Sequence, residues 1–218
     1  MRGRQAHTSP SPLEGSDDEI RPCVACSQGC TDEIFSGRPV YCVDNPRAGF
    51  EADRKIRPTD SPKRIMVVGA GAAGLEAAVT AAEWGPRVEI YERDSQLGGQ
   101  LWIAGAPPHK HELLEFIRYY RAMINRHRIA LHLNTVVDMA LIRDTATDHV
   151  IVAEGARALI PPITGVERPE ILNAWQVLKD NPMLGKQVAI IIIIIGGGGA
   201  VGLVFCLKRN RHEPPLKL

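Results

Sequence analysis

The chain has 218 residues, of which 44% are hydrophobic and 23% charged, a composition typical of a soluble globular protein with one domain or two small ones. The 26 basic and 25 acidic residues leave a net charge of +1, which excludes the electrostatic footprint of a nucleic-acid-binding protein. The N-terminus has no apolar stretch like that of a secretory signal, so we expect a cytoplasmic protein whose thiols stay reduced.

Four of the five cysteines fall in one short segment near the N-terminus. Residues 1–20 are rich in serine, proline and acidic residues and are expected to be a disordered start. Residues 21–50 form a turn-rich loop with the spacing Cys23-x2-Cys26-x3-Cys30-x11-Cys42. Clustered thiolates in a cytoplasmic protein are typical of metal ligands, and four thiolates favour an iron–sulfur cluster. A structural zinc site and free cysteines stay open as alternatives.

A polar linker over residues 51–63 leads into a pattern that predicts a Rossmann unit over residues 64–160. A strand at 64–68, a helix at 75–84 and a strand at 88–91 form β-α-β in about 30 residues. The turn before the helix carries the dinucleotide-binding glycines Gly69, Gly71 and Gly74, which place a pyrophosphate on the helix N-terminus. Glu92 ends the second strand, where a carboxylate can bind ribose hydroxyls. A glycine turn with no ligand is the alternative.

The remainder of this unit continues the α/β pattern. A loop containing Gly98 and Gly99 precedes a predicted helix over residues 110–127. Spacings of three and four residues give this helix one apolar stripe, made of Leu113, Phe116, Ile117, Tyr120, Met123 and Ile124. Strands are expected at 129–133 and 149–153.

A second glycine motif lies near the C-terminus. Residues 161–187 are a connection with a short helix near 174–179, and a strand at 188–195 follows. Gly197, Gly199 and Gly202 then repeat the motif, and with a helix at 201–207 they predict a truncated NAD(P)H-binding unit over residues 188–218. Residues 188–207 lack charge and are long enough for a membrane helix, but the isoleucine run and the glycines argue against one. A membrane-tethered protein is kept as an alternative.

Several of these segments resemble one known family, that of 2,4-dienoyl-CoA reductase and trimethylamine dehydrogenase, which are NAD(P)H:flavin oxidoreductases related to old yellow enzyme. The resemblance rests on Arg21-Pro22-Cys23-Val24-Ala25-Cys26-Ser27-Gln28-Gly29-Cys30, Cys42-Val43-Asp44-Asn45-Pro46-Arg47-Ala48, Leu97-Gly98-Gly99-Gln100-Leu101 and Asn173-Ala174-Trp175-Gln176-Val177-Leu178. It covers roughly residues 19–202 and implies an α/β fold with a cysteine-rich loop before a Rossmann-like FAD-binding unit.

The resemblance implies an electron-transfer flavoenzyme. Hydride would pass from NAD(P)H to FAD, and single electrons would cross a 4Fe-4S cluster to FMN in a barrel that this sequence lacks, where a small-molecule, enoyl-type substrate is reduced. The implied cluster ligands are Cys23, Cys26, Cys30 and Cys42. The implied FAD residues are Gly69, Gly71, Gly74, Glu92, Gly98 and Gly99, with Val137 near the adenine.

The sequence departs from the family after the predicted strand at 149–153. The family's Ala-Thr-Gly segment reads Ala153-Glu154-Gly155 here, which places a carboxylate near an anionic cofactor. A non-catalytic zinc- or nucleotide-binding module is the alternative function. A homo-oligomer is compatible with the sequence.

Overall fold

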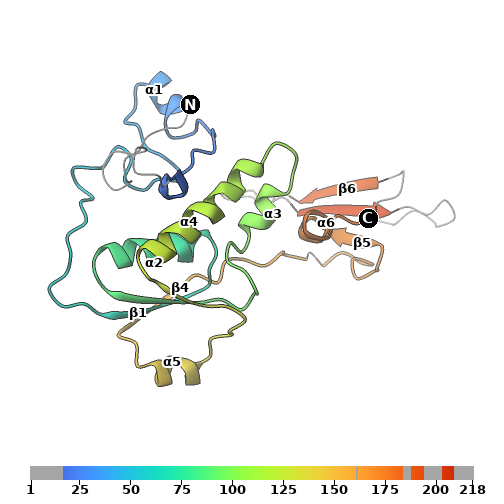
Figure 1. The fold of residues 1–218 in the computed structure, drawn as a ribbon. Coiled ribbons are helices and arrows are strands. Elements are labelled where there is room, and N and C mark those ends of the chain that lie inside the picture. Colours follow the sequence, from blue (N-terminus) through green and yellow to red (C-terminus); the bar gives the residue numbers. More distant parts are fainter. Residues whose placement is uncertain (1–16, 161, 184–187, 194–202, 209–218) are drawn as a thin grey trace. The chain divides into compact units, whose positions relative to one another are not determined.

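The computed structural model describes residues 17–160, 162–183, 188–193 and 203–208 (Figure 1). The chain divides into two compact units, Met1–Gly155 and Ala156–Leu218. The first unit contains the cysteine loop and the predicted Rossmann fold.

A four-stranded parallel sheet forms the centre of the first unit. Its strands lie in the order β3-β2-β1-β4 and are β1 (Arg64–Val68), β2 (Arg87–Tyr91), β3 (Ala130–His132) and β4 (His149–Val152). Val67 of β1 stands in parallel register with Ile90 of β2 and Ile151 of β4. The four predicted strands and the Rossmann-like α/β class are therefore confirmed.

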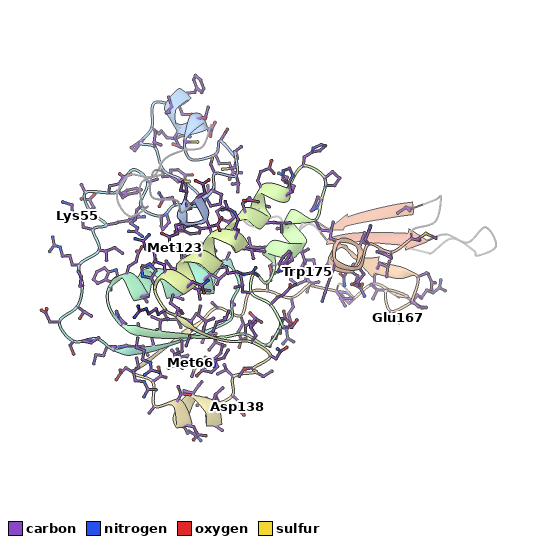
Figure 2. All side chains as sticks on the ribbon, in the orientation of Figure 1. Lys55, Met66, Met123, Asp138, Glu167 and Trp175 are labelled. Atoms are coloured by element: carbon purple, nitrogen blue, oxygen red, sulfur yellow. The ribbon has the colours of Figure 1, made fainter. Side chains whose placement is uncertain are left out.

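Two helices of 12 residues each pack on one face of this sheet, α2 (Ala72–Glu83) and α4 (Glu115–Arg126) (Figure 1). The apolar stripe predicted for the second of them is largely buried, and Figure 2 shows Met123 on this side of the sheet. Leu75 of α2 joins the stripe and Val67 in a single hydrophobic core. Met66 is buried as well, but strand alternation directs it toward the opposite face.

Shorter elements complete the first unit, namely η2 (Asp17–Glu19), α1 (Thr31–Phe35), α3 (Leu101–Gly105), η3 (His111–Leu114) and α5 (Met139–Thr145). The predicted helix over 110–127 begins as the 3-10 turn η3 and continues as α4. The sequence did not predict α1, α3 or α5, because helices this short show no clear periodicity. At α5, Asp138 accepts a hydrogen bond from the N–H of Leu141 at 2.8 Å, a capping pattern that could have identified it.

The second unit contains a small antiparallel sheet and one helix. Its strands lie in the order β5-β7-β6 and its elements are β5 (Ile171–Asn173), α6 (Ala174–Asp180), β6 (Val188–Ile193) and β7 (Leu203–Lys208). The short helix expected near 174–179 is confirmed as α6, which opens with a capping box between Asn173 and Gln176.

The structure corrects one prediction in this unit. A helix was expected over residues 201–207, but residues 203–208 form β7, which pairs antiparallel with β6. Val204 and Phe205 favour strands, and a helix of seven residues is marginal without a packing face. The expected strand at 188–195 is confirmed as β6 up to Ile193.

The predicted second motif, Gly197, Gly199 and Gly202, lies outside the described residues. In the part of the chain that the structure does describe, no helix has the length and apolar character needed to cross a membrane.

Replacing a core side chain of β2 should destabilise the first unit. Ile90→Ala is expected to lower its free energy of unfolding by about 2–5 kcal/mol, because Ile90 is completely buried. The matched control is Ile34→Ala on α1, where the side chain is 61% exposed. The control should cost less than about 0.5 kcal/mol. Urea denaturation followed by far-ultraviolet circular dichroism measures both, and equal costs would contradict the assignment of the core.

Candidate dinucleotide-binding site and cysteine loop

The turn between β1 and α2 stands at the carboxyl edge of the parallel sheet. Because β1 pairs with β2 on one side and β4 on the other, this turn lies at the topological switch point, where open α/β sheets bind their ligands. A Cβ atom at position 74 would overlap the carbonyl oxygen of Gly69. Gly74 therefore allows α2 to begin in close contact with the end of β1.

Gly71 has the opposite environment. No atom of the described residues outside its own turn comes within 4 Å of a Cβ atom placed there, and Gly71 is the N-cap of α2. Glycine offers no side chain to cap the first N–H groups of the helix, which carry the positive end of the helix dipole. The start of α2 can therefore accept an anion such as a pyrophosphate.

The structure brings Glu92 to this turn. The residue is only 6% exposed. Its Oε2 accepts a hydrogen bond from the N–H of Ala70 at 2.6 Å, and its Oε1 accepts one from the N–H of Asp94 at 3.0 Å. The carboxylate is thus fixed beside the glycines instead of being a solvated surface charge. Its binding of ribose hydroxyls stays a prediction.

Two further turns meet the first one. The N–H of Gly98 donates to the carbonyl of Ala70 at 2.8 Å, and a Cβ atom at Gly99 would lie 3.1 Å from the Cα of Gly71. After β4, a Cβ atom at Gly155 would lie 2.9 Å from Nε2 of Gln100. Three turns that are distant in the sequence therefore converge at the N-terminus of α2.

Val137 and Glu154 lie at the margins of this site. Val137 is half-buried and follows Thr135, whose N–H donates to the carbonyl of Glu92 at 2.8 Å. This places Val137 on the segment beside Glu92, whereas its contact with adenine stays a prediction. Glu154 is exposed, and its Cα would lie 3.5 Å from a Cβ atom at Gly69, so the departure from the family puts a carboxylate next to the glycine turn.

Three of the four clustered cysteines lie on exposed parts of the loop. Cys23, Cys26 and Cys30 are exposed free thiols, and Cys42 is a half-buried one. Among the described residues, no three His, Cys, Asp or Glu side chains are gathered closely enough to hold a metal ion. The donor types fit an iron–sulfur site, but the sulfur positions do not form one cage, so the ligand assignment stays a prediction.

The backbone of this loop folds back on itself. The N–H of Tyr41 donates to the carbonyl of Gly29 at 2.8 Å, so the next residue on each side, Cys30 and Cys42, flanks this contact. The N–H of Ala25 points toward Sγ of Cys23 at 3.4 Å. Backbone N–H groups directed at sulfur are what tunes an iron–sulfur site. The loop thus directs one backbone N–H at a cysteine sulfur, and an iron–sulfur cluster at this place stays a prediction.

A buried arginine, Arg21, whose role does not follow from the sequence, attaches the loop to the sheet unit. The Arg21 side chain is 3% exposed and pairs with Oε2 of Glu76 on α2 at 2.5 Å. Its guanidinium carbon lies 4.8 Å from the ring centroid of Tyr119. Burial acts to lower the pKa of Arg21, but the adjacent Glu76 carboxylate raises it above its ordinary value, so the cation persists. The sequence around Arg21 does not indicate that its side chain is buried, because the residues that contact it are distant in the sequence.

Comparison with known proteins places the chain among oxidoreductases. Residues 63–212 match the family described as pyridine nucleotide-disulphide oxidoreductase. The chain is 39% identical over 177 residues to the bilirubin reductase of Mediterraneibacter gnavus (strain CC55_001C), covering 81% of this chain and 28% of that protein. It is 37% identical over 198 residues to the metal reductase of Desulforamulus reducens, covering 88% and 28%. The chain therefore spans just over a quarter of the length of these relatives.

A solved structure is similar to this chain in fold. A 2-naphthoyl-CoA reductase, in complex with 2-naphthoyl-CoA, superposes with a TM-score of 0.75 at 35% sequence identity. The similarity covers 80% of this chain and 27% of that chain.

Adding one methyl group at position 74 should damage the fold. Gly74→Ala is expected to destabilise the first unit by about 1–3 kcal/mol, because the new Cβ overlaps the backbone of Gly69. Gly71→Ala is the matched control, since its Cβ meets open space, and should cost less than about 1 kcal/mol. Urea denaturation of both variants checks the contrast. Equal losses would show that α2 does not pack against β1 in this way.

Proposed function

This chain belongs to the pyridine nucleotide-disulphide oxidoreductase family, and we propose that its first unit binds FAD as the flavin unit of an NAD(P)H-dependent oxidoreductase. The relatives confirm the resemblance to the 2,4-dienoyl-CoA reductase and trimethylamine dehydrogenase type. One observation carries the FAD proposal. Three glycine-bearing turns and the buried carboxylate of Glu92 converge on the open N-terminus of α2.

Each part of the site has a task in holding the cofactor. Gly71 and the first N–H groups of α2 would bind the pyrophosphate, and Glu92 would bind the ribose hydroxyls. Gly98 and Gly99 keep the following loop close to the turn without filling it. When bound, FAD exchanges a hydride with NAD(P)H and can release the two electrons singly. The protein side of the mechanism is binding and orientation.

The proposal extends to the cysteine loop. Cys23, Cys26, Cys30 and Cys42 would supply the four thiolates of a 4Fe-4S cluster, which carries one electron at a time. The donor set and the N–H of Ala25 directed at Cys23 support this ligand choice. Metal binding by such a loop is coupled to its folding, so we expect the metal to order the loop.

The proposal also includes a complete electron path. Electrons would pass from NAD(P)H through FAD and the cluster to an FMN barrel, which acts on a small-molecule substrate. The relatives include a bilirubin reductase, a cinnamate reductase and a 2-naphthoyl-CoA reductase, and the compounds in these names are all unsaturated. We therefore propose an unsaturated, enoyl-type organic compound as the substrate class.

A methyl group at Gly71 should separate cofactor binding from folding. Gly71→Ala is expected to weaken FAD binding at least about tenfold, equivalent to about 1.4 kcal/mol, because the methyl occupies the space open to the pyrophosphate. The control is Trp84→Phe, at the opposite end of the same helix, which should bind FAD normally. Flavin fluorescence titration measures both affinities. Normal FAD binding by Gly71→Ala would show that FAD does not bind at the N-terminus of α2.

Serine substitutions should identify the metal ligands. After anaerobic reconstitution with iron and sulfide, Cys26→Ser is expected to lose most of the bound iron and of the visible absorbance that bleaches on reduction. Cys206→Ser is the matched control, because the fifth cysteine lies outside the proposed ligand set. Metal analysis and absorbance spectra of the full chain provide the measurement.

The other outcomes of this experiment are equally informative. Bound zinc without colour would favour a non-catalytic module. Absence of both iron and flavin in the reconstituted chain would overturn the proposed function.

A further inference from the structure

Arg21 joins the two ends of the cysteine loop. It precedes Cys23 by two residues, and Asp44 follows Cys42 by two residues. Nη1 of Arg21 donates to the carbonyl oxygen of Asp44 at 3.0 Å and lies 3.5 Å from its Oδ1. One guanidinium therefore connects the chain next to the first cysteine with the chain next to the last one.

The same guanidinium also fixes the loop to α2. Its Nη2 lies 2.5 Å from Oε2 of Glu76, a residue in the second turn of that helix. Glu76 is itself held in place, because its Oε2 accepts a hydrogen bond from the hydroxyl of Tyr120 at 2.9 Å. The cysteine loop is thus attached to the helix that carries the glycine turn at its N-terminus.

The surroundings of Arg21 require an arginine. Two acceptors lie in different directions, Asp44 on the loop and Glu76 on α2, and a forked guanidinium can serve both while a lysine ammonium acts as a point charge. The rings of Tyr119 and Tyr120 lie 4.8 and 5.6 Å from the guanidinium carbon and add cation–π attraction. The side chain is 3% exposed, so these protein groups take the place of nearly all of its hydration.

We propose that Arg21 is a positioning residue for metal binding by the cysteine loop. By joining the chain at Asp44 to its own segment and anchoring both to α2, it sets the backbone onto which the four thiolates close. It acts through the backbone at Cys23 and Cys42 and is not a ligand. This inference rests on the proposed function, because it requires that the loop takes up a metal.

Arg38 provides a matched control within the same loop. It also makes a bidentate ion pair with Glu33. Its Nε lies 2.5 Å from Oε2 of Glu33, and its Nη2 lies 3.0 Å from Oε1. That pair is local, spans five residues along the chain, and its arginine side chain is 56% exposed. Removing Arg38 deletes the same charge without disconnecting the ends of the loop.

The test is an anaerobic titration of the full chain with Co²⁺, whose thiolate complexes give sulfur-to-metal charge-transfer absorption. Arg21→Met should bind Co²⁺ about 10- to 100-fold more weakly than the wild-type chain, because the chain segments next to Cys23 and Cys42 are no longer held together. Arg21→Lys should recover part of the affinity, and Arg38→Met should bind normally. Far-ultraviolet circular dichroism establishes that each variant is folded.

A second variant keeps the proposal testable where Arg21→Met does not fold. Glu76→Gln removes the anchor on α2 and should also weaken Co²⁺ binding. Where Arg21→Met does fold, the loss in the double variant should be smaller than the sum of the two single losses, because both act through one contact. Fully additive losses, or a normal affinity in Glu76→Gln, would overturn the anchoring role.

The remaining outcomes separate this inference from the proposed function. A wild-type chain that shows no thiolate–Co²⁺ absorption overturns the metal part of the proposed function, and the Arg21 role with it. A wild-type chain that binds Co²⁺ while Arg21→Met binds equally well overturns the Arg21 role alone. Equal losses in Arg21→Met and Arg38→Met would also overturn it, because only the net charge would then matter.

Discussion

The close approach of α2 to the end of β1 determines the arrangement of the first unit. Position 74 has no room for a side chain, because a Cβ there would overlap the carbonyl oxygen of Gly69. This contact places the N-terminus of α2 at the switch point of the sheet, with Gly71 open. The loop at Gly98 and the carboxylate of Glu92 then both bond to the backbone of Ala70 inside the turn. The candidate cofactor site is thus built on one steric constraint and completed by hydrogen bonds.

Helix α2 serves the two candidate sites at once. Its N-terminus forms the glycine turn, and Glu76 in its second turn receives Arg21 from the cysteine loop. Arg47 near the end of the loop pairs with Glu83 at the end of the same helix at 2.5 Å. Because a helix is a rigid element, a loop held at two points along α2 keeps a defined position relative to the glycine turn. A defined separation between the two sites is what the proposed relay of single electrons requires.

The sequence predicted the features that depend on local patterns. The β-α-β unit around Gly69 and the apolar stripe of α4 follow from spacing alone, and both are confirmed. The Arg21 cluster could not be predicted, because its bonds reach 23 residues to Asp44, 55 to Glu76 and 99 to Tyr120. The prediction of a helix at 201–207 was wrong for a related reason. β7 is stabilised by pairing with β6 and β5, and partner strands are not visible in a short window.

The two candidate sites also differ in how far a fold can prepare them. A dinucleotide site made of N–H groups is fixed by the strand, the turn and the helix. The backbone of residues 69–74 therefore determines its geometry. Four cysteine ligands cannot be fixed in that way, because the bound metal itself draws the sulfurs together and binding is coupled to the ordering of the loop. The fold can prepare only the backbone that carries the sulfurs. Contacts such as Gly29 with Tyr41 and Arg21 with Asp44 do this, and they close the backbone of the loop on which the exposed residues Cys23, Cys26 and Cys30 lie.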